Sequence, residues 1–161
     1  MKKSRVGLAT ARILLASNAI ADNSRVSTAT CFLDLGASVG SSPYSERSGG
    51  ALFVSDIRCP AGVTRVLVQR VAFDPFGGVG FSMNAPFQGI TVGLGPIPSL
   101  DQSDLLAVLS NATREITLAR QVRLDIAGSQ FITWRQDCFS GLSGVNPTCG
   151  GRLYFVGTVV Q

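Results

Sequence analysis

Residues 114–126 read REITLARQVRLDI, and this stretch decides the fold. Apolar side chains recur at every second position over most of it, with polar side chains between them: Ile116, Leu118, Val122, Leu124 and Ile126. A period of two is typical of a β-strand with one face on a core. We therefore predict a strand over 114–126 with this set pointing inward. Arg120 falls on the same side, so we expect either a β-bulge or an interface position there, or a partner for an inward-facing guanidinium.

Around this strand, seven further short runs are rich in Val, Ile, Thr and Phe and are separated by Gly, Pro, Ser and Asn. They cover residues 26–35, 50–58, 64–73, 79–83, 89–94, 129–135 and 152–160. Short β-branched and aromatic runs between turn residues are typical of all-β sandwiches, and eight strands are the number in a jelly roll. We predict an all-β, eight-stranded antiparallel sandwich over residues 26–161, with Trp134 and the nine phenylalanines in its core.

Two short helices are expected beside the strands. Residues 6–20 are rich in Ala and Leu and contain no Pro, which favours an N-terminal helix. The run Ser99-Leu100-Asp101-Gln102 has the spacing of a capping box, so a second helix is expected to begin there and to end near Asn111.

The formal net charge of +4 resides entirely in the leader, residues 1–25. Lys2, Lys3, Arg5 and Arg12 precede the first acidic residue, and the other ten basic residues match the ten acidic ones in number. One hypothesis is a retained arm that contacts packaged nucleic acid or a neighbouring subunit. The other is a secretion signal cleaved after Ala21, with an extracellular or periplasmic product. The apolar part is too short, and too interrupted by Arg12, to span a membrane.

Four cysteines stand at Cys31, Cys59, Cys138 and Cys149. A disulfide between the last two would close the loop that they flank and contribute about 3 kcal/mol. Cys31 and Cys59 lie in or beside the first two predicted strands and are candidates for a second bridge, which would indicate an oxidising environment. The alternative is that all four are reduced and buried as small apolar residues.

No catalytic residues, metal site or cofactor are predicted. The chain contains no histidine, which excludes a Ser-His-Asp or Cys-His nucleophile system and any zinc site that includes His. Phosphate-loop, dinucleotide-binding and nucleophile-elbow motifs are absent from the sequence. Hydrophobic residues make up 45% and charged residues only 15%, so we expect part of the surface to be buried against other subunits. Whether Arg65, Arg70, Arg120, Arg123 and Arg135 form one positive face depends on strand pairing.

In its organisation, a basic N-terminal segment followed by an apolar eight-stranded body without catalytic residues, the chain resembles small virus coat or decoration proteins built on a single jelly roll. The resemblance implies a self-assembling virion subunit whose partners are its own copies, other virion proteins and, through the arm, packaged nucleic acid. The arms of coat proteins that package RNA usually carry denser Arg and Lys. Four basic residues would support about four phosphate contacts per subunit. The alternative is an exported, disulfide-stabilised β-sandwich that acts as a binding module or a surface-filament subunit.

Overall fold

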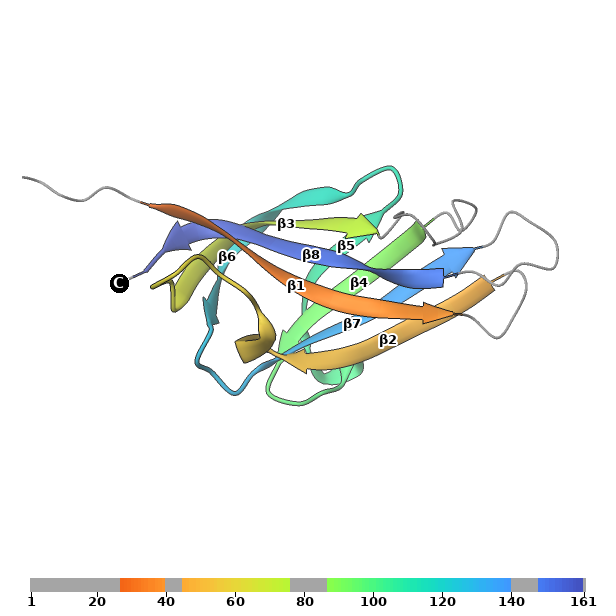
Figure 1. Cartoon of the computed structure of the whole chain (residues 1–161), viewed down its shortest axis with the longest axis horizontal. Coiled ribbons are helices and arrows are strands. Elements are labelled where there is room, and N and C mark those ends of the chain that lie inside the picture. Colours follow the sequence, from red (N-terminus) through yellow and green to blue (C-terminus); the bar gives the residue numbers. More distant parts are fainter. Residues whose placement is uncertain (1–26, 40–44, 76–86, 140–147, 161) are drawn as a thin grey trace, which may run out of the picture.

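The computed structural model describes residues 27–39, 45–75, 87–139 and 148–160. These residues form eight antiparallel strands in two four-stranded sheets that pack face to face, which confirms the predicted all-β sandwich (Figure 1). The strands are β1 (Thr28–Val39), β2 (Ser45–Phe53), β3 (Arg65–Pro75), β4 (Phe87–Gly95), β5 (Asp104–Ser110), β6 (Glu115–Asp125), β7 (Phe131–Phe139) and β8 (Thr148–Val159). Two 3-10 turns complete the elements, η1 (Val54–Asp56) and η2 (Leu100–Gln102).

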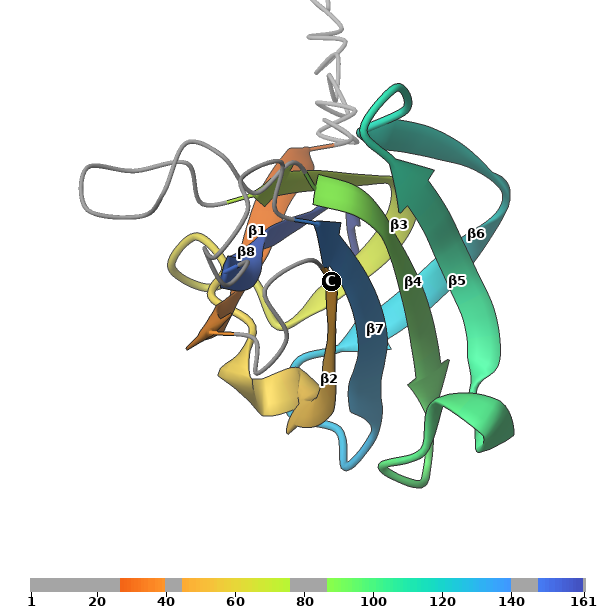
Figure 2. The same ribbon diagram turned by 90° about the vertical axis from the view of Figure 1, so that its right-hand side faces the viewer.

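The strand order is that of a jelly roll. Sheet A has the order β1-β8-β3-β6, and sheet B has the order β2-β7-β4-β5 (Figure 2). The first strand pairs with the eighth, the second with the seventh, the third with the sixth and the fourth with the fifth. This pattern is a long antiparallel hairpin wrapped around the core so that its pairs fall alternately in the two sheets.

The core lies between the two sheets and is built from alternate residues of their central strands. Val66, Val68 and Val71 of β3 face Ile90 and Val92 of β4, and all are essentially inaccessible to solvent. Burial of a Val, Leu or Phe side chain stabilises the fold by about 1.5–3 kcal/mol. Trp134 packs against this cluster as predicted, and Phe73 and Phe155 are inside it. The prediction is wrong for three other phenylalanines: Phe32 lies beside Tyr154 on the outer face of sheet A, and Phe53, 49% exposed at the end of β2, packs against Phe131 outside the core cluster. The side chains of Phe76, Phe81, Phe87 and Phe139 lie outside the described part of the structure.

Strand β6 confirms the alternation of residues 114–126 and resolves the position of Arg120. Leu124 is fully buried, and Ile116, Leu118, Val122 and Ile126 are partly buried against the core. The pairing with β3 shifts in register, because Val68 pairs with Val122 whereas Arg70 pairs with Thr117. This irregularity takes Arg120 out of the apolar row, and its side chain is exposed. An inward-facing guanidinium is therefore wrong. The register shift agrees with the predicted irregularity at this point of the strand, and an interface position for Arg120 stays a prediction.

The second predicted helix is wrong. Ser99 is followed by the single 3-10 turn η2, and residues 104–110 form strand β5 instead of continuing a helix. Leucine and alanine favour a helix in isolation, but pairing with β4 buries Leu106, Ala107 and Leu109, and this tertiary burial overrides the local preference. Ser99 has an extended backbone and makes no side-chain cap.

The other predicted strands correspond to observed ones with shifted ends. The largest difference is at 50–58, because β2 begins at Ser45 and ends at Phe53, where η1 follows. The predicted strand 79–83 and the predicted helix 6–20 lie outside the described residues.

Candidate assembly surface

The sequence predicted two groups of site residues, namely the basic contact residues of the leader and the cysteines of the candidate disulfides. Lys2, Lys3, Arg5 and Arg12 lie outside the described residues. The cysteines form two disulfides, Cys31–Cys59 and Cys138–Cys149, so the reduced alternative is wrong.

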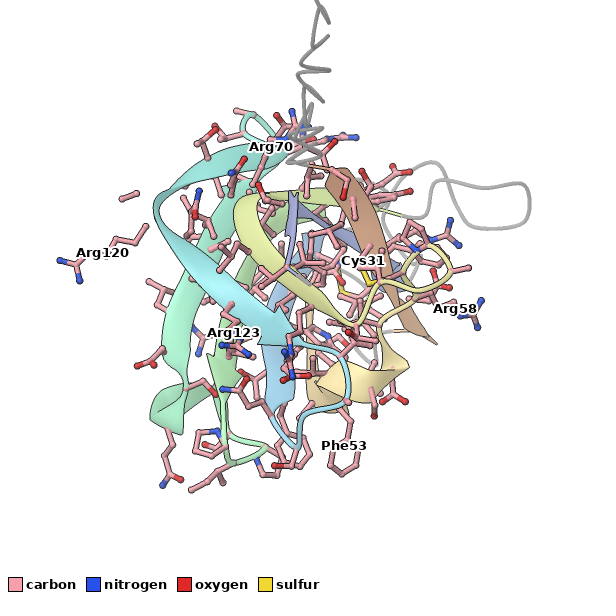
Figure 3. All side chains as sticks on the ribbon, turned by 90° about the vertical axis from the view of Figure 1, so that its left-hand side faces the viewer. Cys31, Phe53, Arg58, Arg70, Arg120 and Arg123 are labelled. Atoms are coloured by element: carbon pink, nitrogen blue, oxygen red, sulfur yellow. A yellow bond between two sulfur atoms is a disulfide. The ribbon has the colours of Figure 1, made fainter. Side chains whose placement is uncertain are left out.

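The Cys31–Cys59 bridge attaches the connection between η1 and β3 to the edge of sheet A. Cys31 is fully buried in β1, and Cys59 stands just before the turn at Gly62, where φ is +82°. Figure 3 shows Cys31 with its disulfide, and Arg58 on the connection beside it. Next to the bridge, the backbones of Phe32 and Arg58 exchange two hydrogen bonds of 2.9 and 2.8 Å. The connection therefore covers part of the β1 edge that would otherwise expose unpaired backbone groups.

The Cys138–Cys149 bridge joins the two sheets. Cys138 lies near the end of β7 in sheet B, and Cys149 lies at the start of β8 in sheet A. Both side chains are buried. This is the disulfide predicted from the sequence, between cysteines 11 residues apart, and it links the two sheets at one end of the sandwich.

The outer face of sheet A carries paired charges. Arg65 pairs with Asp125 at 3.4 Å, and Arg70 pairs with Glu115 at 3.0 Å. All four side chains are more than one third exposed, so each pair contributes little to stability.

A third pair on this face is part of a small aromatic cluster. Arg152 Nε lies 2.6 Å from Asp34 Oδ1, and its guanidinium stands 4.5 Å from the centre of the Phe32 ring. Hydrogen bonds to Asp34 and Tyr154 raise the pKa of Arg152 above its ordinary value. The Arg58 guanidinium approaches the same Phe32 ring at 5.9 Å. The cluster holds its arginines by charge and by cation–π contact.

The five arginines considered together in the sequence do not form one positive face. Arg65 and Arg70 are paired with acids on sheet A, and Arg123 lies opposite Leu67 on the same sheet. Arg120 points away from the body at the bend of β6 (Figure 3). Arg135 belongs to β7 in sheet B.

Sheet B and its connections expose large apolar side chains. Leu105 and Val108 of β5 are 66% and 55% exposed, Phe53 at the end of β2 is 49% exposed, and Ile97, just after β4, is 47% exposed. We call these four residues the apolar surface. Phe53 stacks on Phe131 with ring centres 4.4 Å apart, which extends the surface along the end of the sheet.

The segment between β4 and β5 lies on the outer face of sheet B. Gly93 makes this approach possible, because a Cβ atom there would lie 2.8 Å from Ser103 Cβ and 3.1 Å from Leu100 Cδ1. Thr133 Oγ1 donates to Ser103 Oγ at 3.0 Å, and Ser103 Oγ donates to the Ser99 carbonyl at 2.7 Å. A groove of about 390 Å³ remains between this segment and β2, lined by Gly49, Gly50, Ala51, Pro98, Leu100 and Arg135 among others.

We expect Thr133→Val to destabilise the protein by about 1 kcal/mol, because it removes the hydrogen bond to Ser103 from a buried position while preserving volume. Urea unfolding monitored by Trp134 fluorescence measures the loss. Thr117→Val is the control, since Thr117 is an exposed threonine on a strand. Equal stability of the two variants would show that the hydrogen bonds from Thr133 to Ser103 and from Ser103 to Ser99 do not hold the β4–β5 connection against sheet B.

The sequence did not identify Leu105 and Val108 as surface residues, because they fell within the predicted helix. Their outward positions depend on an irregularity in the pairing of β5, where the register shifts between Val92 and Gly93. A strict period of two is therefore missing from residues 104–110, and the only available signal was the apolar run of five residues, 105–109, after a Pro- and Ser-containing turn.

Within the described ranges, no group of three Cys, Asp or Glu side chains is placed to hold a metal ion. The same residues include no helix with the length and hydropathy needed to cross a membrane. Comparisons of the chain with protein-family models, with curated proteins and with solved structures find no match.

Proposed function

We propose that this protein is a non-enzymatic structural subunit that assembles with its own copies, and that the assembly is a virion shell or its decoration. The observation that carries the proposal is the difference between the two sheets. Three ion pairs connect strands of sheet A, whereas the four large apolar side chains with the greatest exposure among the described residues belong to sheet B and its connections.

This asymmetry supports assembly for a physical reason. Exposed Leu, Val, Phe and Ile side chains gain about 25 cal/mol for each Å² of apolar area removed from water. Large apolar residues that are exposed on one sheet of a small domain and on its connections suit a surface that is buried against another chain. Paired charges on sheet A need no such partner and suit a surface in contact with water.

The virion assignment is the finer part of the proposal and has separate support. A jelly roll is one of the folds of viral capsid domains, although fold alone does not determine function. The basic leader would lie against packaged nucleic acid or a neighbouring subunit through Lys2, Lys3, Arg5 and Arg12. The disulfides suit a particle released from a reducing cytoplasm.

Assembly predicts a concentration-dependent increase in size. We expect the oxidised full-length protein to sediment as species larger than a monomer when its concentration rises from micromolar to millimolar. Apolar contacts dominate the proposed surface, so this association is expected to persist at high salt. Electron microscopy of the largest fraction shows whether closed particles form. A monomer at every concentration and salt would overturn the proposal.

A second function is supported by the two disulfides and the signal-like leader, namely an exported binding module or surface-filament subunit. The N-terminus of the mature protein separates the two functions. A mature chain that begins at Met1, or at Lys2 after removal of the initiator methionine, supports the retained arm when mass spectrometry finds it. A mature chain that begins at Asp22 supports export and removes the arm.

A further inference from the structure

Two of the four edge strands, β1 and β6, are visibly protected. The β1 edge is bridged by Arg58 and by the Cys31–Cys59 disulfide. Strand β6 exposes the charged side chains of Arg120 and Arg123. Charged residues and covering connections are the usual means by which sheet edges avoid further pairing.

Strand β5 lacks these protections. Within the described residues it pairs only with β4, and β6 crosses to the other sheet after the tight turn at Ser110–Thr113 (Figure 2). Its sequence, DLLAVLS, contains no Pro, no basic residue and a single acid at its first position. Leu105 and Val108 expose more of their surface than any other large apolar residue among those described. The edge offers backbone donors and acceptors flanked by apolar side chains.

The two ends of this edge carry opposite charges. Asp101 and Asp104 are exposed at its beginning. Arg114 follows the turn at its end, where its Nη2 donates to Asn111 Oδ1 at 2.8 Å. None of these three charges has an ion-pair partner within the described part of the chain.

We propose that β5 pairs antiparallel with β5 of a second copy about a twofold axis, which joins two B sheets into one continuous eight-stranded sheet. This inference rests on the proposed function and names its first contact. Antiparallel pairing places the Asp104 end of each strand against the Arg114 end of the other, whereas parallel pairing would oppose like charges. Leu105 and Val108 of both copies then share one face of the new sheet.

The first test removes the apolar contact. We expect Leu105→Lys/Val108→Lys to weaken dimerisation by about 100-fold, as measured by sedimentation equilibrium. Each copy loses the apolar contacts of Leu105 and Val108 at the interface, and the four lysines of the two copies repel one another. Thr28→Lys/Thr117→Lys adds the same charge on the outer face of sheet A and is expected to leave dimerisation unchanged. Thermal unfolding of both variants checks that the sandwich is intact.

The second test reverses the charges and remains informative if the lysine variant fails to fold. Asp104→Arg is expected to weaken the dimer, and Asp104→Arg/Arg114→Asp is expected to restore it, because the reversed pair is again complementary. Hydrogen exchange of the wild type is expected to slow in the backbone amides of β5 as the dimer forms. A doubly reversed variant as weak as the single one would overturn the antiparallel arrangement.

Failure of this inference is distinguishable from failure of the proposed function. If the wild type assembles and Leu105→Lys/Val108→Lys assembles as strongly, β5 pairing is overturned and the structural-subunit function stands. In that case Phe53→Lys/Ile97→Lys, which alters the rest of the apolar surface, would disrupt the assembly instead. A wild type that remains monomeric would overturn both.

Discussion

A Gly157→Ala variant is expected to lose more than about 3 kcal/mol of stability, a large part of the roughly 5–15 kcal/mol that holds a domain of this kind folded. Gly157 is in β8, a central strand of sheet A, where it pairs with Ala29 of β1 and with Val68 of β3. A Cβ atom at this position would stand 2.6 Å from the Leu67 carbonyl carbon and 2.8 Å from the Val68 Cα. Both obstructing atoms belong to the backbone, so no side-chain rotation can relieve the clash.

The matched control is Gly89→Ala in β4 of sheet B. There the nearest atom to an added Cβ is the Leu109 carbonyl oxygen at 3.2 Å, which a small shift can accommodate. We expect this variant to change stability by about 1 kcal/mol or less. Urea unfolding curves of the two variants and the wild type give the comparison. A Gly157→Ala protein as stable as Gly89→Ala would show that β3 and β8 can separate at little cost.

Removal of the Cys31–Cys59 bridge is expected to have the next largest effect. The cysteines are 28 residues apart, so closing this loop limits the unfolded chain and contributes about 3–4 kcal/mol. We expect Cys31→Ala/Cys59→Ala to lose about this much in urea unfolding, and a further amount because Cys31 is fully buried. Hydrogen exchange of Phe32 and Arg58 is expected to become faster, since the bridge beside them would be gone.

Cys138→Ala/Cys149→Ala is the comparison for this prediction. Its separation of 11 residues predicts a loss of about 3 kcal/mol, somewhat less than that of the longer loop. Its local effect is also different, because this bridge joins β7 to β8 and does not touch the β1 edge. Unchanged stability of the Cys31→Ala/Cys59→Ala protein would contradict the structural role assigned to that bridge.

Much of the fold was predictable because local pattern and tertiary burial agree. In β6 the apolar residues from Ile116 to Ile126 alternate, and each lies on the core side. The cysteines were recognisable as candidate pairs from their positions beside predicted strands. Arg120 marked an irregularity in the same pattern, and the register shift against β3 explains it.

The candidate surface was less predictable because pattern and burial disagree there. Residues 104–110 contain Leu and Ala, which favour a helix, and their outward and inward positions depend on a shift in register with β4. Phe53 was expected in the core from its residue type, yet it stands at a strand end against Phe131. Such positions depend on partners distant in the sequence.

The sequence alone determined that the chain is an all-β sandwich, that a body without net charge follows a basic leader, and that no histidine chemistry is available. These properties depend on composition and on a period of two, which neighbouring residues express without any tertiary contact. The tertiary structure alone decided which strands pair, which cysteines meet, and that Leu105 and Val108 face solvent on an unprotected edge. Strand pairing joins residues far apart in the chain, so only the folded arrangement specifies which side chains remain exposed to a second molecule.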